Sequence, residues 1–193
     1  IWNALETRAV IHLIKKIAPQ IQIVLGGPEV SYQPQRVTFE ADYTICGEGD
    51  LAFYTLCKAL LAGTAPEMRQ IYAAPPDLAT LALPYDYYSN HDLQQRITYV
   101  EASRGCPFTC EFCLSSLDQK VRKFETDRFI EQLESLWQRG ARNFKFIDRT
   151  FNLQPQVTNR ILDFFLSKPL PYFAHFEMIP DHFPEHLKDK LRQ

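Results

Sequence analysis

Hydrophobic and polar residues at the start of the chain follow the period of an α-helix. Over residues 3–17 the apolar side chains recur at helical spacing, which predicts a helix with one buried face. The positions on that face are Val10, Leu13, Ile14 and Ile17. Asn3 is placed to cap the helix and Pro19 to stop it.

Two short apolar runs then predict buried strands, at residues 21–25 and 42–46. Each run ends in a glycine turn, Gly26-Gly27 after the first and Gly47-Glu48-Gly49 after the second. A helix capped by Asp50 is expected over residues 51–62. Its apolar side would consist of Phe53, Tyr54, Leu56, Cys57, Leu60 and Leu61. This order is that of half an open α/β sheet, which binds ligands at the carboxyl ends of its strands, where both glycine turns lie.

Residues 63–96 show no regular spacing of apolar and polar residues, because four prolines interrupt the segment. We interpret them as a connector between two domains, with a short strand at residues 70–73.

From residue 97 the pattern predicts three strand–helix pairs. The strands are 97–101, 143–147 and 171–178, and the helices are 127–139, 157–166 and 184–191. On the first of these helices, Phe129, Leu133, Leu136 and Trp137 share one face, and Gly140 follows its end. Consecutive βα units indicate a β/α barrel or part of one. Since a complete barrel needs about 250 residues, this run is expected to be incomplete.

The composition is that of a globular protein, with 46% apolar and 23% charged residues among 193. The net charge of −2, without dense clusters of Lys or Arg, argues against a nucleic-acid surface. No apolar stretch approaches the ~20 residues of a membrane span and no signal peptide is evident, so a cytoplasmic location is expected. Because the first residue is Ile1, we expect a fragment of a longer protein.

Three of the five cysteines lie close together, with the spacing C-x3-C-x2-C at Cys106, Cys110 and Cys113. An odd number of cysteines with such a cluster suits metal binding in a reducing compartment better than disulfides. Three thiolates can hold three irons of a four-iron cluster, and the absence of a fourth nearby cysteine leaves one iron open to a ligand. Cys46 and Cys57 stand in apolar surroundings and are expected to be buried thiols.

Two other metal sites are possible for this loop. A structural zinc ion needs four ligands, usually in two close pairs, and only Cys110 and Cys113 make such a pair. The fourth ligand would then be a remote histidine, one of His91, His175, His182 and His186. An electron-transfer ferredoxin uses four cysteines for each cluster, one more than this loop offers.

The run Cys106-x3-Cys110-x-Phe112-Cys113, directly after the strand that begins the β/α run, resembles the motif of the radical S-adenosylmethionine (SAM) superfamily. The resemblance implies that the three cysteines bind a 4Fe–4S cluster, whose open iron chelates SAM and cleaves it reductively to a 5′-deoxyadenosyl radical. It also implies that Phe112 packs beside the adenosyl group.

In this family an acidic segment after the next strand holds the amino group of SAM, which makes Asp148 the candidate here in place of the usual Gly-Gly-Glu. Glu177 leaves the third strand on the same face and is expected to contact the ribose or amino group of SAM. The alternatives are that Asp148 or Thr150 caps a turn, that Glu177 is a surface carboxylate paired with a base, and that His175 is a core residue rather than a catalytic one. Arg104 and Gly105 are expected to shape the loop, and Arg104 to offset cluster charge.

The glycine turns resemble those in the C-terminal half of the cobalamin-binding domain that precedes the barrel in one radical SAM subfamily. That subfamily includes methyltransferases, cyclases and rearrangement enzymes. The resemblance implies that Gly26 and Gly27 lie against the nucleotide tail of cobalamin, with Gly47 and Gly49 at the rim of the pocket. Because the cobalt-ligating Asp-x-His-x-x-Gly motif is absent, weak cobalamin binding is expected for this chain.

The prediction is therefore an α/β chain with three parts. Residues 1–62 form the C-terminal part of a Rossmann-like, cobalamin-binding type domain, residues 63–96 a connector, and residues 97–193 the N-terminal half of an incomplete (β/α) radical SAM barrel. The expected function is a radical SAM enzyme that starts radical chemistry on an unidentified substrate, with cobalamin-dependent methyl transfer or cyclisation as the reaction. Its electron donor would be a flavodoxin or ferredoxin. The alternatives are a zinc-stabilised binding or scaffold module and a degenerate, non-catalytic relative.

Overall fold

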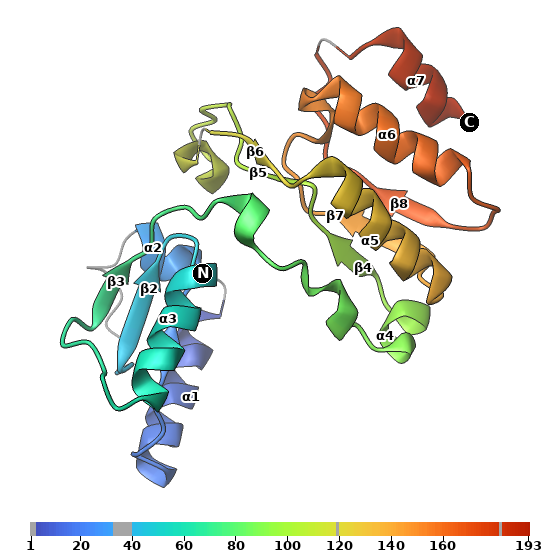
Figure 1. The fold of residues 1–193 in the computed structure, drawn as a ribbon. Helices are drawn as coiled ribbons and strands as arrows, with labels where there is room; N and C mark the ends of the chain where they lie inside the picture. Colours follow the sequence, from blue (N-terminus) through green and yellow to red (C-terminus); the bar gives the residue numbers. More distant parts are fainter. Residues whose placement is uncertain (1–2, 33–39, 119, 182) are drawn as a thin grey trace. The chain divides into compact units, whose positions relative to one another are not determined.

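A computed structural model describes residues 3–32, 40–118, 120–181 and 183–193. The chain divides into two compact units, Ile1–Asp77 and Leu78–Gln193, which Figure 1 draws in sequence colours. The boundary falls inside the segment that the sequence marks as a connector. Each unit holds parallel strands together with helices, so the predicted α/β fold class is confirmed. No helix in the described ranges is both long and apolar enough to cross a membrane.

The first unit is built on a three-stranded parallel sheet. Its strands are β1 (Val24–Leu25), β2 (Tyr43–Cys46) and β3 (Gln70–Tyr72), in that order across the sheet. Its helices are α1 (Ala4–Ile17), α2 (Pro28–Tyr32) and α3 (Asp50–Leu61). The predicted strands and the two longer helices are confirmed, and the short helix α2 was not predicted.

A small apolar core and a half-buried ion pair hold this unit together. Tyr43 and Ile45 of β2 pack with Leu56 of α3. The Lys15 ammonium of α1 donates to the Asp42 carboxylate over 2.6 Å, and the same carboxylate accepts from the backbone N–H of Ile23 over 2.7 Å. Asp42 therefore ties α1 to the start of the sheet.

The predicted buried face of α1 is wrong. Val10, Leu13 and Ile17 are 54%, 56% and 74% exposed, and Ile11 is the buried residue of this helix. Three short strands offer little surface for packing, so an apolar stripe at helical spacing does not by itself become a buried face. Asn3 is the N-cap residue by position, but its side chain makes no capping hydrogen bond.

The predicted apolar side of α3 is also largely exposed. Phe53, Tyr54 and Leu61 lie open to solvent, and Leu56 is the buried residue of the helix. The N-cap is Gly49 rather than Asp50, which is the first helical residue.

The second unit contains the strand–helix pairs that the sequence predicts. Parallel strands β4 (Thr98–Val100), β7 (Asn143–Phe146) and β8 (Phe173–His175) form a sheet in that order. Helices α5 (Thr126–Gln138), α6 (Pro155–Leu166) and α7 (Glu185–Arg192) follow them in the chain, and Figure 1 shows α5 and α6 packed beside the sheet. Strand β8 is shorter than predicted.

Short elements complete this unit. They are η2 (Leu78–Thr80), η3 (Pro84–Tyr87), α4 (Asn90–Gln95), β5 (Ser103–Arg104), η4 (Leu114–Leu117), β6 (Arg122–Lys123) and η5 (Phe151–Leu153). None of them was predicted. Helix α4 begins with a capping box in which the Ser89 hydroxyl accepts from the Asp92 N–H and the Asp92 carboxylate accepts from the Ser89 N–H.

The core of the second unit is rich in aromatic rings. Phe144 and Phe146 of β7 are fully buried, and the Phe146 ring lies 6.0 Å from Phe129, 5.4 Å from Phe151 and 4.8 Å from Phe176, centroid to centroid. The four predicted core positions of α5 are all buried, namely Phe129, Leu133, Leu136 and Trp137. Helix packing thus covers one face of the sheet.

Two tyrosine hydroxyls cover the free edge of β4. The Tyr85 hydroxyl accepts from the Glu101 N–H over 2.9 Å, and the Tyr88 hydroxyl accepts from the Tyr99 N–H over 3.2 Å. The Tyr85 hydroxyl also donates to the Glu101 carbonyl oxygen, and the Tyr88 hydroxyl donates to the Tyr99 carbonyl oxygen. The two phenols therefore satisfy backbone groups that a further strand would otherwise pair.

Candidate functional site

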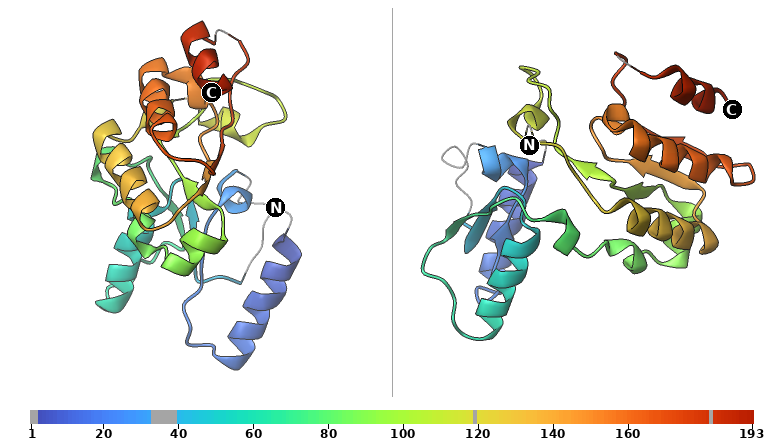
Figure 2. Two further views of the ribbon diagram at one scale, coloured as in Figure 1. Left: turned by 90° about the vertical axis from the view of Figure 1, so that its right-hand side faces the viewer. Right: turned by 45° about the horizontal axis from the view of Figure 1, so that its top comes forward.

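The cysteine loop is mounted on a two-stranded antiparallel ribbon, β5–β6, which Figure 2 shows from two sides. The ribbon pairs Ser103 with Lys123 and Arg104 with Arg122. Just inside it, the Cys106 N–H donates to the Asp118 carbonyl oxygen over 2.8 Å. The loop is thus closed at its base, directly after the first strand of the parallel sheet.

Gly105 makes this closure possible. Its φ of +90° is a conformation that residues with a side chain rarely adopt. A Cβ atom at this position would lie 2.4 Å from the carbonyl oxygen of Lys120, on the opposite side of the loop. The prediction that Gly105 shapes the loop is confirmed.

The three thiols are accessible and form no disulfide. Cys110 is exposed, and Cys106 and Cys113 are half-buried. The Cys113 N–H donates to the Cys110 carbonyl oxygen over 3.1 Å, which turns the chain between these two positions. The neighbouring Phe112 side chain is 94% exposed.

The donor chemistry of the loop fits an iron–sulfur cluster, since three thiols stand on one short closed segment. Within the described residues, however, no three Cys, His or carboxylate side chains lie close enough together to hold a metal ion. Binding a cluster would therefore require the loop to bring its sulfur atoms together. His182, one of the histidines considered for zinc, lies outside the described residues.

Arg104 forms an ion pair in the segment that leads into the loop, residues 102–104, which we call the root of the loop. Its Nε donates to both carboxylate oxygens of Glu101, over 3.0 and 3.1 Å, and its guanidinium lies 5.7 Å from the centroid of the Phe124 ring. Its charge is therefore matched by Glu101.

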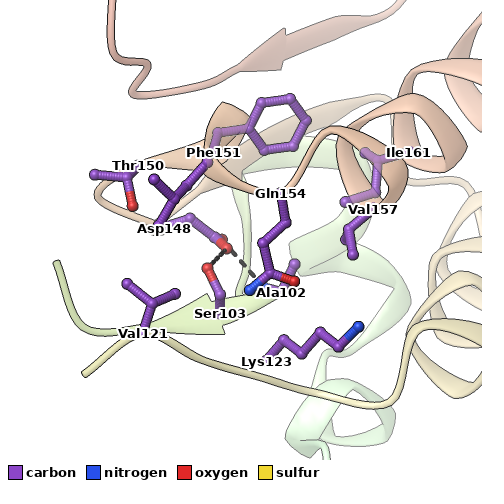
Figure 3. A pocket seen from close by; sticks show the side chains of 11 residues that line it. Ala102, Ser103, Val121, Lys123, Asp148, Thr150, Phe151, Gln154, Val157 and Ile161 are labelled. Carbon is purple, nitrogen blue, oxygen red and sulfur yellow. Dashed lines mark hydrogen bonds between the residues drawn. The ribbon is translucent and has the colours of Figure 1, made fainter. Parts of the chain in front are cut away.

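Asp148 lies two residues past the end of β7 and is 2% exposed. One carboxylate oxygen accepts from the Ala102 N–H over 3.0 Å, and the other accepts from the Ser103 hydroxyl over 2.7 Å, as Figure 3 shows. Burial raises the pKa of Asp148 above the ordinary value, although the hydrogen bonds from Ser103 and Ala102 act in the opposite direction.

Thr150 lines the same small pocket as Asp148 and is 4% exposed. Its hydroxyl oxygen is buried without a hydrogen-bond partner among the described residues, so it does not cap the turn that follows it.

The sheet face opposite the helices carries polar side chains. In the register of the strands, Tyr99 of β4 pairs with Lys145 of β7, and Lys145 pairs with His175 of β8. The Lys145 Nζ lies 5.9 Å from the centroid of the Tyr99 ring. His175 is exposed, so its interpretation as a core histidine is wrong.

Glu177 follows β8 and pairs with a base, as the surface alternative expected. Its carboxylate lies 3.2 Å from an Arg149 guanidinium nitrogen, and the two side chains are 39% and 54% exposed. Its backbone carbonyl accepts from the Phe151 N–H over 2.9 Å. These contacts link the segments that leave β7 and β8.

In the first unit, a cavity of about 410 Å³ opens at the carboxyl ends of β1 and β2. Its lining includes Gly26, Gly27, Gly47, Gly49 and Phe53. Four glycines leave backbone accessible with little side-chain bulk, which suits close contact with a large, flat ligand. The cavity therefore brings together the glycine pairs that the sequence singles out.

The two cysteines of this unit differ in burial. Cys46 is buried and its thiol donates to the Val30 carbonyl oxygen over 3.2 Å, as expected for a structural thiol. Cys57 is only half-buried.

Comparison with known proteins finds relatives whose similarity extends over both units. Residues 1–57 match the model of the B12 binding domain. An uncharacterized methyltransferase of Pyrococcus horikoshii is 31% identical over 178 residues, which cover 77% of this chain and 38% of that protein. The cobalamin-dependent radical SAM methyltransferase TokK of Streptomyces tokunonensis is 25% identical over 185 residues, covering 81% of this chain and 27% of the relative. The chain is thus similar to cobalamin-dependent radical SAM methyltransferases, and its first unit matches the B12 binding domain.

The fold of this chain matches a solved structure. The radical SAM methyltransferase TsrM from Kitasatospora setae, with tryptophan substrate and a SAM analogue bound, superposes with a TM-score of 0.72 at 17% identity. The match covers 98% of this chain and 42% of TsrM. The chain thus spans less than half the length of each of these relatives.

Sequence reasoning missed two parts of the candidate site. The ribbon β5–β6 was not predicted, because strands of two residues are too short to show a period. Ser103 was not selected either, although its position between a strand and the cysteine run was a usable signal.

Proposed function

We propose that this chain carries the SAM-cleaving part of a cobalamin-dependent radical SAM methyltransferase. The observation that carries the proposal is the three-cysteine loop, closed at its base by β5–β6 and mounted directly after the first strand of a parallel β/α sheet. Active sites of β/α folds lie at the carboxyl ends of the strands, where this loop begins. The named methyltransferases among the relatives favour methyl transfer over ring closure.

In this proposal Cys106, Cys110 and Cys113 hold a 4Fe–4S cluster. When bound, the cluster supplies the electron, received from a flavodoxin- or ferredoxin-type donor, that cleaves SAM to a 5′-deoxyadenosyl radical. The chain's own residues hold and orient the reactants. Phe112 presents an exposed ring on which an adenine can stack, and Glu177 offers a half-exposed carboxylate to the ribose or amino group.

The glycine-lined cavity of the first unit is proposed to take the nucleotide tail of cobalamin. Gly26 and Gly27 stand where β1 ends, so a ligand can approach their backbone closely. When bound, cobalamin supplies the carrier for the methyl group. The substrate is proposed to be a small molecule.

Anaerobic reconstitution with iron and sulfide tests the proposal. About four irons per chain and a brown chromophore are expected, as a cubane cluster requires. Cys106→Ala, Cys110→Ala and Cys113→Ala should each abolish the four-iron cluster. The matched control is Cys57→Ala, which removes a half-buried thiol of the first unit and should leave the iron content unchanged. Full iron content in all three loop variants would contradict the assignment.

The alternatives give different results in the same experiment. One colourless zinc ion per chain would support a zinc-stabilised module. A normal iron content without release of 5′-deoxyadenosine from SAM, after reduction of the complete protein, would support a non-catalytic relative.

A further inference from the structure

Asp148 connects the end of β7 to the root of the cysteine loop. Both of its acceptors are engaged, one by the Ala102 N–H and the other by the Ser103 hydroxyl. These two donors stand just before Arg104-Gly105-Cys106 in the chain. A buried carboxylate that receives two such bonds holds its partners firmly, because neither side can exchange them easily for water.

The carboxylate continues the pairing of β4 with β7 after their backbones separate. The last paired positions are Val100 and Phe146, and the Ile147 N–H still donates to the Val100 carbonyl oxygen over 3.0 Å. One step further along, the Ala102 N–H meets the Asp148 side chain instead of a backbone carbonyl. The side chain thus makes the next connection between the two segments.

The backbone contacts that Ala102 and Ser103 make on their other side belong to the ribbon β5–β6 and not to the parallel sheet. The Ala102 carbonyl oxygen accepts from the Phe124 N–H over 3.0 Å, and Ser103 pairs with Lys123. These contacts close the loop on itself. They do not fix the loop to β7.

We infer that Asp148 is a positioning residue, which fixes the root of the cysteine loop to the carboxyl edge of the parallel sheet through Ala102 and Ser103. The importance of this role for a cluster rests on the proposed function. The anchor itself does not, because its contacts are made by the chain alone. With the root fixed, the ordering needed to gather three sulfur atoms is confined to residues beyond Gly105.

This role differs from the contact with SAM that the sequence predicts for Asp148. A side chain that is 2% exposed, with a donor on each oxygen, presents little of its carboxylate to a ligand. The two roles also make different predictions. Loss of an anchor disturbs the loop before any SAM is added, whereas loss of a SAM contact leaves the loop and its iron intact.

Asn152 provides a matched control in the same turn. It is 6% exposed, its amide donates to the Ile179 carbonyl oxygen over 2.8 Å, and its side-chain oxygen accepts from the Ile179 N–H over 2.7 Å. It resembles Asp148 in being buried and in bonding to a neighbouring segment through both side-chain atoms, but its partner lies after β8 instead of in the cysteine loop.

The experiment compares Asp148→Ala with Asn152→Ala by amide hydrogen exchange, in protein without a cluster. Asp148→Ala should speed exchange at both Ala102 and Cys106 by about tenfold or more, the effect of losing one charge-assisted hydrogen bond. Asn152→Ala should speed exchange at Ile179 and leave Cys106 unchanged. After anaerobic reconstitution, the iron content should fall in Asp148→Ala alone.

Two milder variants keep the test decisive if Asp148→Ala does not fold. Ser103→Ala removes one of the two donors and should give a smaller change at Cys106. Asp148→Asn keeps one acceptor oxygen for the Ala102 N–H and should restore part of the protection.

Unchanged exchange at Cys106 in Asp148→Ala and Ser103→Ala would overturn the inference. So would a normal iron content combined with weakened SAM binding, which would restore the SAM contact. If the unmodified protein takes up no iron, the proposed function fails, but the exchange rates still decide whether Asp148 is an anchor.

Discussion

Replacing Gly105 by alanine should open the base of the cysteine loop. The new Cβ would lie 2.4 Å from the Lys120 carbonyl oxygen, 2.9 Å from its carbonyl carbon and 3.2 Å from the Asp118 carbonyl oxygen. Ordinary contacts begin at 3.4 Å, so Lys120 would have to move by 3.4 − 2.4 = 1.0 Å. All three neighbouring atoms belong to the backbone, which cannot rotate away as a side chain can.

The cost of this substitution has two parts. A side chain at positive φ costs about 1–2 kcal/mol. Moving Lys120 also breaks the bond from the Cys106 N–H to Asp118, and loosens the pairing of Arg104 with Arg122, at about 1 kcal/mol for each hydrogen bond lost. The free energy of unfolding should therefore fall by roughly 2–4 kcal/mol. The fall cannot exceed the cost of opening the loop alone, because the loop can open while the core stays folded.

Gly140→Ala separates the two parts. Gly140 lies in the same unit with a φ of +105°, and its nearest neighbour for a Cβ is the Gln94 side chain at 3.5 Å, an ordinary contact. This variant should lose about 1–2 kcal/mol in urea unfolding and keep its iron content after reconstitution. Gly105→Ala should lose both its iron and the exchange protection of the Cys106 amide. Equal iron content and equal Cys106 protection in the two variants would refute the reasoning.

Three further substitutions test other parts of the second unit. Tyr85→Phe leaves the Glu101 N–H without its phenol partner and should lower the free energy of unfolding by about 1–3 kcal/mol in urea titrations; no loss would show that the phenol does not secure the β4 edge. Phe146→Ala removes a fully buried ring and should cost about 3–5 kcal/mol by the same measurement, so a cost below that of Tyr85→Phe would contradict the aromatic core. Burial raises the pKa of Asp148, so its ionisation disfavours the folded state. Unfolding titrations across pH should show wild-type stability falling, relative to Asp148→Asn, as pH rises from 3.8 through the raised pKa, and a constant difference would exclude a raised pKa.

Periodicity predicted the longer helices of both units, but their burial in only one. The apolar positions of α5, such as Phe129 and Leu133, are buried because β7 and α6 supply a large aromatic surface. The same kind of stripe on α1 leaves Leu13 and Ile17 exposed, because the described part of the first unit has no comparable surface. A pattern of spacing identifies the face that can be buried. It does not say whether a partner is present.

The cysteine motif was readable in the sequence because its chemistry depends on spacing along one short loop. The elements that support the loop could not be predicted from the sequence, because they depend on contacts between residues far apart in the chain. Ribbon β5–β6 joins residues about twenty positions apart through two paired positions in each strand, and Gly105 is needed because Lys120 returns close to it. Of these features, the sequence indicated only the glycine.

Asp148 shows where sequence reasoning about a site must stop. A carboxylate just past a strand of a β/α sheet stands where ligands bind, and the same position lets it reach the neighbouring strand's exit segment. A SAM contact and an anchor for the cysteine loop would both be a carboxylate residue at this position after the strand. The choice between them depends on Ala102 and Ser103, more than forty residues earlier in the chain. Because those two donors occupy both carboxylate oxygens in a buried position, the structure favours the anchor, and the exchange rate at Cys106 measures it directly.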